Sequence, residues 1–235
     1  MRIGDDLKNR PNGITESVDA DAHYLAQLVD LGIALSAEQG REELHQKILM
    51  AARQFTNADG GSLYLVNKDE TELQFRILMN DTLDTFFVSG RENEKPFPPL
   101  PLYDAAGNPN HKNIATYVAL SGESINIEDA YFADGFDFSG TRAFDAKTGY
   151  RSKSFLTVPL KNTRGNVIGV LQLINARNNA GDIIAFDPAI EPIINALASQ
   201  AAVALENSRL LMAQRDLMES FVRVLGQAID AKSPH

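Results

Sequence analysis

Histidine and cysteine are the side chains that most often carry catalysis or bind transition metals, and this chain is poor in both. It has four histidines and no cysteine among 235 residues. The histidines are His23, His45, His111 and His235. They form no HxxxH or HD pair, and Ser62 has no neighbouring base of the nucleophile-elbow type. The sequence therefore predicts that this chain is not an enzyme and holds no metal or cofactor.

Clustered acidic residues are the other candidates for cation binding. Asp134, Asp137 and Asp145 lie close together in the sequence, and carboxylate oxygens are suitable ligands for hard cations. Asp is also common in turns, where its side chain accepts backbone N–H groups. We favour the turn interpretation, because the segment around these residues is irregular.

The composition argues against several classes of partner. The net charge is −9, whereas nucleic-acid binding requires a clustered basic surface. No apolar run reaches the roughly 18 residues that a membrane-spanning helix needs. The start of the chain is polar and acidic, unlike a secretory signal. We predict a flexible leader at residues 1–20 and a cytoplasmic protein without nucleic-acid or membrane partners, which also fits the lack of cysteine.

The order of hydrophobic periods predicts the fold class. Steps of three and four predict helices at residues 21–39, 41–57 and 188–231, the last beginning with the N-cap pair Asp187-Pro188. A period of two predicts one strand hairpin within residues 60–78 and another within 154–176.

The segment at residues 80–113 is rich in Pro, Asn and Gly and predicts a long surface loop. Short hairpin connections favour antiparallel pairing. We therefore expect an α+β fold, an α/β sandwich in which helices cover one face of an antiparallel sheet and long helices stand at the N- and C-terminal ends.

Three segments resemble one known family. The stretch "TGYRSKSFLTVPLKNTRGNVIGVLQLINARN" resembles the second half of GAF domains, "SGESINIEDAY" resembles the family's Gly turn and the strand after it, and "GGSLYLVN" resembles its first strand. The likeness spans roughly residues 40–210. It implies a small-molecule sensor domain at residues 21–207, with a pocket on the sheet face away from the long helices.

The resemblance also implies which residues bind a ligand. The matching positions are Ser62, Ile114, Ala115, Asp145, Thr148 and Gln172. Backbone N–H groups near 114–115 would receive a phosphate at a helix N-terminus. The ligand would be a small molecule or nucleotide.

The chain departs from the pattern of the cyclic-nucleotide-binding members. These carry an Asn-Lys pair, then Phe and Asp-Glu, whereas here Asn175 is followed by Ala176 and Arg177. The family's Lys–Asp salt bridge therefore cannot form in its usual way. Gln172 also replaces a family Glu. A cyclic nucleotide is compatible with the sequence but not implied by it, and a ligand-free dimerisation scaffold is the alternative function.

The last helix carries a heptad pattern. Its apolar positions alternate steps of four and three from Ile190 to Ile229, which is typical of a left-handed coiled coil. The outer part of this pattern predicts a homodimer contact. Its members are Leu211, Met218, Val222, Leu225 and Ile229. Ser208 and Arg215 interrupt it, which indicates a weak and switchable segment.

The final residues, "QAIDAKSPH", resemble the beginning of bacterial HD-GYP domains, which are metal-dependent phosphodiesterases of cyclic di-GMP. The resemblance implies that residues 208–235 form a signalling helix leading to an output domain after His235. The predicted function is a regulatory, small-molecule-sensing GAF domain. It dimerises and transmits a signal through its long helix to an HD-GYP phosphodiesterase.

Overall fold

The computed structural model describes residues 26–38, 40–90 and 97–232, with side chains described as far as residue 227. The predicted leader at residues 1–20 lies outside this part of the chain. The strands are β1 (Ala58–Val66), β2 (Glu72–Asn80), β3 (Thr85–Val88), β4 (Leu100–Pro101), β5 (Ile125–Ile127), β6 (Phe155–Lys161), β7 (Val167–Arg177) and β8 (Ile183–Ile184). The helices are α2 (Arg41–Thr56), α3 (Ile114–Ser121), α4 (Ser139–Thr148) and α5 (Glu191–Lys232), together with a first helix described at Ala26–Ser36.

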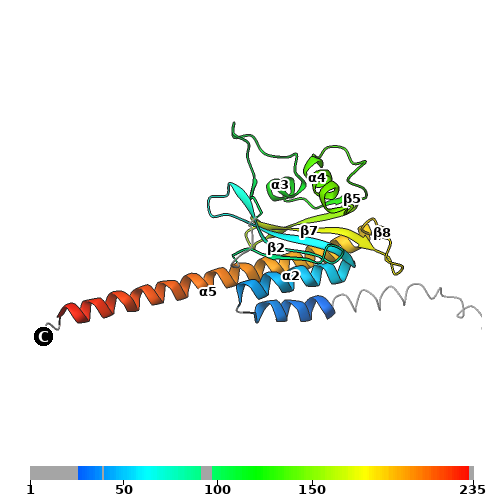
Figure 1. The fold of residues 1–235 in the computed structure, drawn as a ribbon. Coiled ribbons are helices and arrows are strands. Elements are labelled where there is room, and N and C mark those ends of the chain that lie inside the picture. The colour runs from blue at the N-terminus through cyan, green and yellow to red at the C-terminus, as the bar shows by residue number, and fades with distance from the viewer. Residues whose placement is uncertain (1–25, 39, 91–96, 233–235) are drawn as a thin grey trace, which may run out of the picture.

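The strands form one eight-stranded sheet in the order β3-β2-β1-β7-β6-β5, with β4 paired to β2 and β8 paired to β7. Every pairing is antiparallel. Figure 1 shows the long helices α2 and α5 along one face of this sheet and the short helices α3 and α4 above the other. The predicted α+β sandwich is confirmed, and the long helices occupy a single face as expected.

The predicted hairpins form because their turns satisfy their own backbone groups. Between β1 and β2, the Asn67 Oδ1 atom accepts the N–H groups of Thr71 at 2.8 Å and Glu72 at 3.2 Å. Between β6 and β7, Gly165 has a φ of 84°, a region that glycine enters without steric cost. These local signals are why the sequence predicts both turns correctly.

Residues 80–113 are not the continuous loop that the sequence predicts. They contribute β3 along one edge of β2, and β4, which pairs with Glu72 and Leu73. Both strands are short and have Pro or Asn close by, so they show little alternation of their own. Their extended conformation is decided by pairing with β2, which the local sequence does not reveal.

The core between the sheet and the long helices fixes α2 and the first part of α5 on this face. Ile48 of α2, Leu171 of β7 and Leu197 of α5 have no exposed surface. Burying a side chain of this size stabilises the fold by about 1.5–3 kcal/mol. Such contacts hold α2 and α5 against the sheet face opposite α3 and α4.

Only the first part of α5 packs on the sheet. The Asp187 Oδ1 atom accepts the N–H of Ala189 at 2.9 Å and caps the short 3₁₀ helix Pro188–Ile190, which leads into α5. Buried side chains continue to Leu205, whereas every residue from 213 to 227 is exposed. Figure 1 shows this part of α5 extending away from the domain.

His45 is a buried base on α2, with 3% of its surface exposed. Burial, and then the positive charges of Arg76 and Arg41, lower the pKa of His45 to about 4. An unfolded His titrates near its ordinary pKa of 6.5. Because the folded pKa is the lower one, the unfolded state binds more protons between these values. The stability contribution of neutral His45 is therefore fully present above pH 6.5 and is lost as the pH falls toward 4.

We expect the wild-type chain to lose up to about 3 kcal/mol of unfolding free energy over this interval, relative to a His45→Gln variant. The glutamine does not titrate, so the comparison cancels the contribution of the carboxylates. Urea denaturation of both proteins at several pH values across the interval measures the difference. Parallel pH profiles in the two proteins would contradict the assignment to His45.

Candidate functional site

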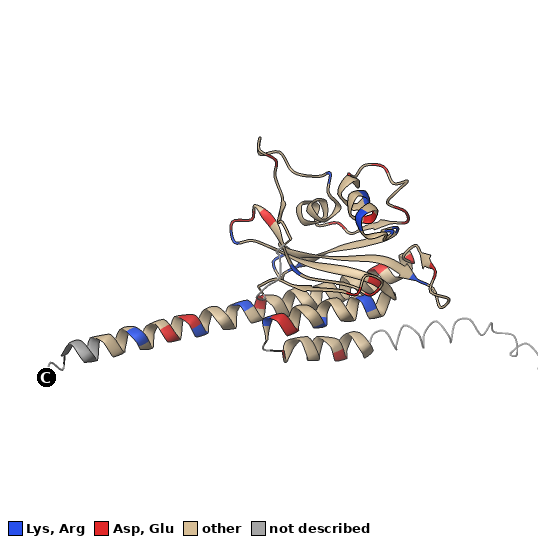
Figure 2. Ribbon diagram, viewed as in Figure 1, with Lys and Arg blue, Asp and Glu red and all other residues tan. Residues whose placement is uncertain are grey.

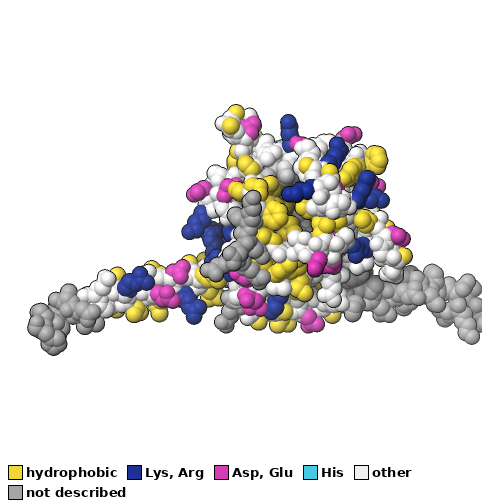
Figure 3. Space-filling model, viewed as in Figure 1, with side chains coloured by type: hydrophobic (Ala, Val, Ile, Leu, Met, Phe, Trp, Pro, Cys, Tyr) yellow, Lys and Arg dark blue, Asp and Glu magenta, His cyan; other side chains and the backbone are white. Residues whose placement is uncertain are grey.

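A cavity of about 800 Å³ lies on the sheet face opposite α2 and α5. Its floor is formed by β1, β2, β6 and β7, and its roof by α4 and the segments that lead into α3 and α4. Six aromatic side chains line it, namely Tyr64, Phe75, Phe97, Phe144, Tyr150 and Phe155. Figure 3 shows hydrophobic side chains gathered on this side of the molecule, between the roof and the long helices. Apolar walls with a few oriented polar groups are typical of small-molecule sites.

The polar part of the floor centres on Gln172 of β7. Its Oε1 atom accepts a hydrogen bond from the Tyr64 hydroxyl at 3.2 Å, and its Nε2 atom donates to Thr157 Oγ1 at 3.2 Å. Burial raises the pKa of Tyr64, so its hydroxyl stays protonated and acts as a donor. The amide of Gln172 is thus held in one orientation. Its second lone pair and second N–H can present an acceptor beside a donor to a ligand.

The N-termini of α3 and α4 both border the cavity. Lys112 and Asn113 line it just before α3, and Ser139, Gly140 and Thr141 line it in the first turn of α4. The first N–H groups of a helix have no partner within the helix, and they favour negative charge. Asp137 already uses one of these groups, because its Oδ1 atom accepts the N–H of Ser139 at 2.8 Å.

The N-terminus of α3 differs from what the resemblance implies. Ile114 and Ala115 are 5% and 1% exposed and pack into the core beneath the roof, and neither lines the cavity. The Asn113 Oδ1 atom accepts the N–H of Ala115 at 2.9 Å and that of Thr116 at 3.3 Å. A side-chain cap therefore occupies the Ala115 N–H group that the sequence assigns to a phosphate.

Asp145 also lies outside the cavity lining. Its Oδ2 atom accepts the Tyr131 hydroxyl at 2.7 Å and the Ser152 N–H at 2.8 Å, and its Oδ1 atom accepts the Ser152 hydroxyl at 2.8 Å. These bonds tie α4 to the chain on both sides of it. In the structure Asp145 anchors the roof.

Of the six ligand-binding positions inferred from the resemblance, the structure brings Ser62, Thr148 and Gln172 together in the cavity lining. Sequence reasoning missed Asn113 and Tyr150, which also line it. Asn113 could have been found, because an Asn directly before an apolar helix is a typical N-cap signal. Tyr150 carries no such local signal.

A polar network holds Tyr150, which lines the cavity, against the sheet. Asp59 of β1, only 1% exposed, forms an ion pair with Arg177 at the end of β7. The Tyr150 hydroxyl donates to Asp59 Oδ2 at 2.5 Å. Burial and then this carboxylate raise the pKa of Tyr150. Arg177, which follows Asn175 and Ala176, is thus paired with an aspartate of β1.

Asn175 joins this network to the strand that follows the roof. It has a φ of 59°, which is uncommon for a residue with a side chain. Its Oδ1 atom accepts the N–H of Lys153 at 2.7 Å, and its Nδ2 atom donates to the Tyr150 hydroxyl at 2.9 Å and to the Arg151 carbonyl at 2.7 Å. Tyr150 is therefore held between the sheet and the roof by groups from β1 and β7.

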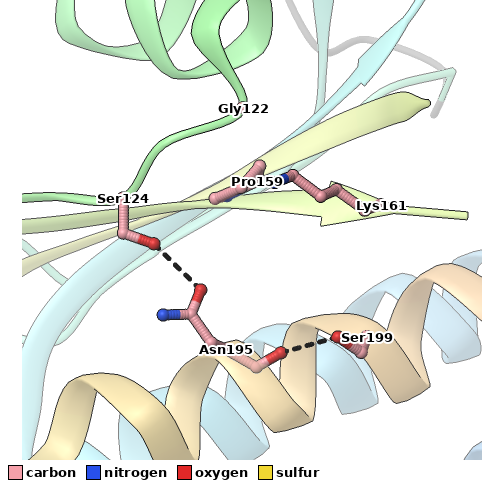
Figure 4. Close-up of a pocket in the computed structure, with 6 residues that line it drawn as sticks. All are labelled: Gly122, Ser124, Pro159, Lys161, Asn195 and Ser199. Atoms are coloured by element: carbon pink, nitrogen blue, oxygen red, sulfur yellow. Dashed lines mark hydrogen bonds between the residues drawn. The ribbon is translucent and has the colours of Figure 1, made fainter. Parts of the chain in front are cut away.

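A second cavity of about 340 Å³ lies between β6 and α5 and has no aromatic lining. Figure 4 shows Ser124, which follows α3, donating to the Asn195 side chain of α5. The Ser124 Oγ to Asn195 Oδ1 distance is 2.9 Å. This bond connects the roof side of the domain directly to the long helix.

Within residues 26–38, 40–90 and 97–232, no group of three His, Cys, Asp or Glu side chains is placed to hold a metal ion. One helix, Pro188–Gln227, is long and apolar enough to cross a membrane, but 39% of its most apolar 18-residue stretch is buried inside the domain. Core helices of globular domains pass the same test, so this is weak evidence for a membrane span.

The antiparallel sheet thus carries long helices on one face and a roofed pocket on the other. The sequence profile of the GAF domain family matches residues 40–205, and the chain belongs to this family. The matched region is a regulatory sensing domain, in agreement with the sequence resemblance.

The chain is similar to parts of cyclic-nucleotide phosphodiesterases. It is 32% identical to a probable 3′,5′-cyclic phosphodiesterase of Caenorhabditis elegans over 70% of this chain and 20% of that protein. It is 33% identical to the dual 3′,5′-cyclic-AMP and -GMP phosphodiesterase 11 of Drosophila melanogaster over 71% of this chain and 11% of that protein. The chain thus spans about a fifth or less of the length of these curated relatives.

The fold is similar to that of a GAF domain from an Acinetobacter phosphoenolpyruvate-protein phosphotransferase, with a TM-score of 0.57 and 16% identity. That match covers 81% of this chain and 98% of the other. The predicted GAF fold is therefore confirmed by both sequence and structure.

Proposed function

We propose that the chain senses a cyclic nucleotide in the cavity of about 800 Å³ and passes its occupancy to α5. The observation that carries this proposal is the combination of six aromatic side chains with a fixed Gln172 amide on the floor. Aromatic rings can stack on a purine, and an oriented amide can bond to its donor–acceptor edge. The similarity to 3′,5′-cyclic phosphodiesterases supports the same ligand class.

The phosphate would lie at the other side of the cavity, near Lys112 and the first turn of α4. Phe138 is the N-cap residue of α4, and its side chain makes no capping hydrogen bond. Binding of an anion is favoured here by the N–H groups of Gly140 and Thr141 and by the Lys112 ammonium. Asp137 opposes the phosphate there, so we expect moderate affinity.

Occupancy would reach α5 through the roof. Ser124, in the segment that follows α3, donates a hydrogen bond to the Asn195 side chain of α5 and would be the point of contact. The exposed end of α5 would pair with a second copy of the chain and carry the signal to an output domain. We propose that this is an HD-GYP phosphodiesterase, on the basis of the "QAIDAKSP" resemblance. We expect the protein to act in the cytoplasm.

Titration calorimetry with cyclic AMP, cyclic GMP and cyclic di-GMP tests the ligand. We expect one of the two mononucleotides to bind. Gln172→Leu should weaken its binding at least tenfold, because leucine cannot form hydrogen bonds with the edge of the purine. Ser199→Ala, in the smaller cavity, is the matched control and should bind as the wild type does. A folded wild type that binds none of the three would favour the ligand-free scaffold.

A further inference from the structure

Gln172 lies in a row of polar side chains that crosses the floor of the larger cavity. Ser62 of β1 and Thr157 of β6 lie directly opposite it, one on each neighbouring strand. The Tyr64 hydroxyl donates to Gln172 Oε1, and Gln172 Nε2 donates to Thr157 Oγ1, each at 3.2 Å. The middle of these three strands carries no charged residue, as Figure 2 shows. Neutral groups would therefore select a base that lies on this floor.

The hydrogen bonds in this row run in one direction. Burial raises the pKa of Tyr64, and a side-chain hydrogen bond with Ser62 partly offsets that rise. A hydrogen bond lowers the pKa of a tyrosine when it is donated to the phenol oxygen, so Ser62 is the donor. Tyr64 donates its own proton to Gln172, and the amide in turn donates to Thr157.

Two buried hydroxyl groups hold the amide in this orientation. Tyr64 is 4% exposed and Thr157 has no exposed surface, so water has little access to either bond. Turning the amide over would place its NH₂ group against the Tyr64 hydroxyl, and the Tyr64 proton would lose its acceptor. A buried donor without an acceptor is costly. A ligand therefore meets an acceptor on the β1 side of the amide and a donor on the β6 side.

Adenine and guanine differ at the edge that such an amide reads. Adenine has an acceptor at N1 beside a donor at its 6-amino group, whereas guanine has a donor at N1 beside an acceptor at O6. The two purines thus present the same pair of groups in opposite order. A fixed amide matches one of them, and it meets the other with donor against donor and acceptor against acceptor.

We propose that Tyr64 is the positioning residue that decides which of the two purines the cavity accepts. This inference rests on the proposed function, because a phosphate near Lys112 sets the direction in which the purine enters. Tyr64 acts through Gln172. Its hydroxyl fixes the order of acceptor and donor on the amide, and that order selects the base. An amide free to turn over would accept either purine.

The Tyr64→Phe variant tests this role, because it removes the hydroxyl and keeps the ring, whose centroid lies 4.4 Å from that of Phe75. Titration calorimetry would compare cyclic AMP with cyclic IMP. The base of cyclic IMP has N1–H and O6 as guanine does, but no 2-amino group, so the two ligands differ only at the edge in question. We expect the wild type to bind one of them at least tenfold more tightly than the other, and the variant to bind both within about threefold.

Tyr103→Phe is the matched control, because Tyr103 lies outside the cavity lining and is 42% exposed. It should keep the wild-type ratio of affinities, and urea denaturation shows whether both variants are folded. Equal binding of the two ligands by the wild type would overturn the role of Tyr64 and leave the proposed function intact. A folded Tyr64→Phe variant that keeps the wild-type ratio would do the same. A wild type that binds neither of them, nor cyclic GMP, would overturn the proposed function itself.

Discussion

Asp59→Ala should lower the free energy of unfolding by about 3 kcal/mol. The substitution leaves the Arg177 guanidinium and the Tyr150 hydroxyl without the carboxylate that both contact. Removing one partner of a buried ion pair costs about 3–5 kcal/mol. We expect the lower end, because 31% of the Arg177 side chain is exposed and water screens part of its charge.

Asp81→Ala is the matched control for this substitution. Asp81 also forms an ion pair with an arginine, Arg53, but 67% of its side chain is exposed. Surface pairs of this kind contribute about 0–1 kcal/mol. Urea denaturation followed by circular dichroism measures both variants. Equal losses in the two would show that the Asp59 network does not carry the stability assigned to it.

The double variant Leu217→Asp/Met218→Asp should abolish the dimer. It places two carboxylates on the exposed apolar face of α5, so pairing of two such helices would bring negative charges together in an apolar seam. Each single substitution should weaken the dimer less, because more of the apolar face remains intact. We expect at least a hundredfold increase in the dimer dissociation constant for the double variant, measured by analytical ultracentrifugation.

The domain itself should remain folded in this variant. Both residues are exposed and lie beyond the last side chain of α5 that packs on the sheet. A free energy of unfolding in urea close to that of the wild type would establish this. Arg223→Gln, on the side of the helix away from these apolar residues, should keep the wild-type dissociation constant. An unchanged dimer in the double variant would rule out a dimer contact through this part of α5.

The candidate site was predicted from the sequence only in part. Ser62 and Gln172 come from the family resemblance, and the structure places both in the cavity lining. Ala115 and Asp145 come from the same resemblance, but Ala115 packs into the core and Asp145 anchors the roof. The difference depends on how α3 and α4 sit above the sheet, which periodicity does not describe.

The sequence by itself determined the long helices, the two main strand hairpins with their turns, and the heptad period of the last helix. These features depend on residues a few positions apart, whose spacing matches the geometry of a helix, strand or turn. Only the tertiary structure decided that Asp59 meets Arg177 and Tyr150, that Gln172 bonds to Tyr64, and that the apolar side chains at the outer end of α5 remain exposed. Such contacts join residues far apart in the chain and depend on strand order, register and the place where α5 leaves the sheet.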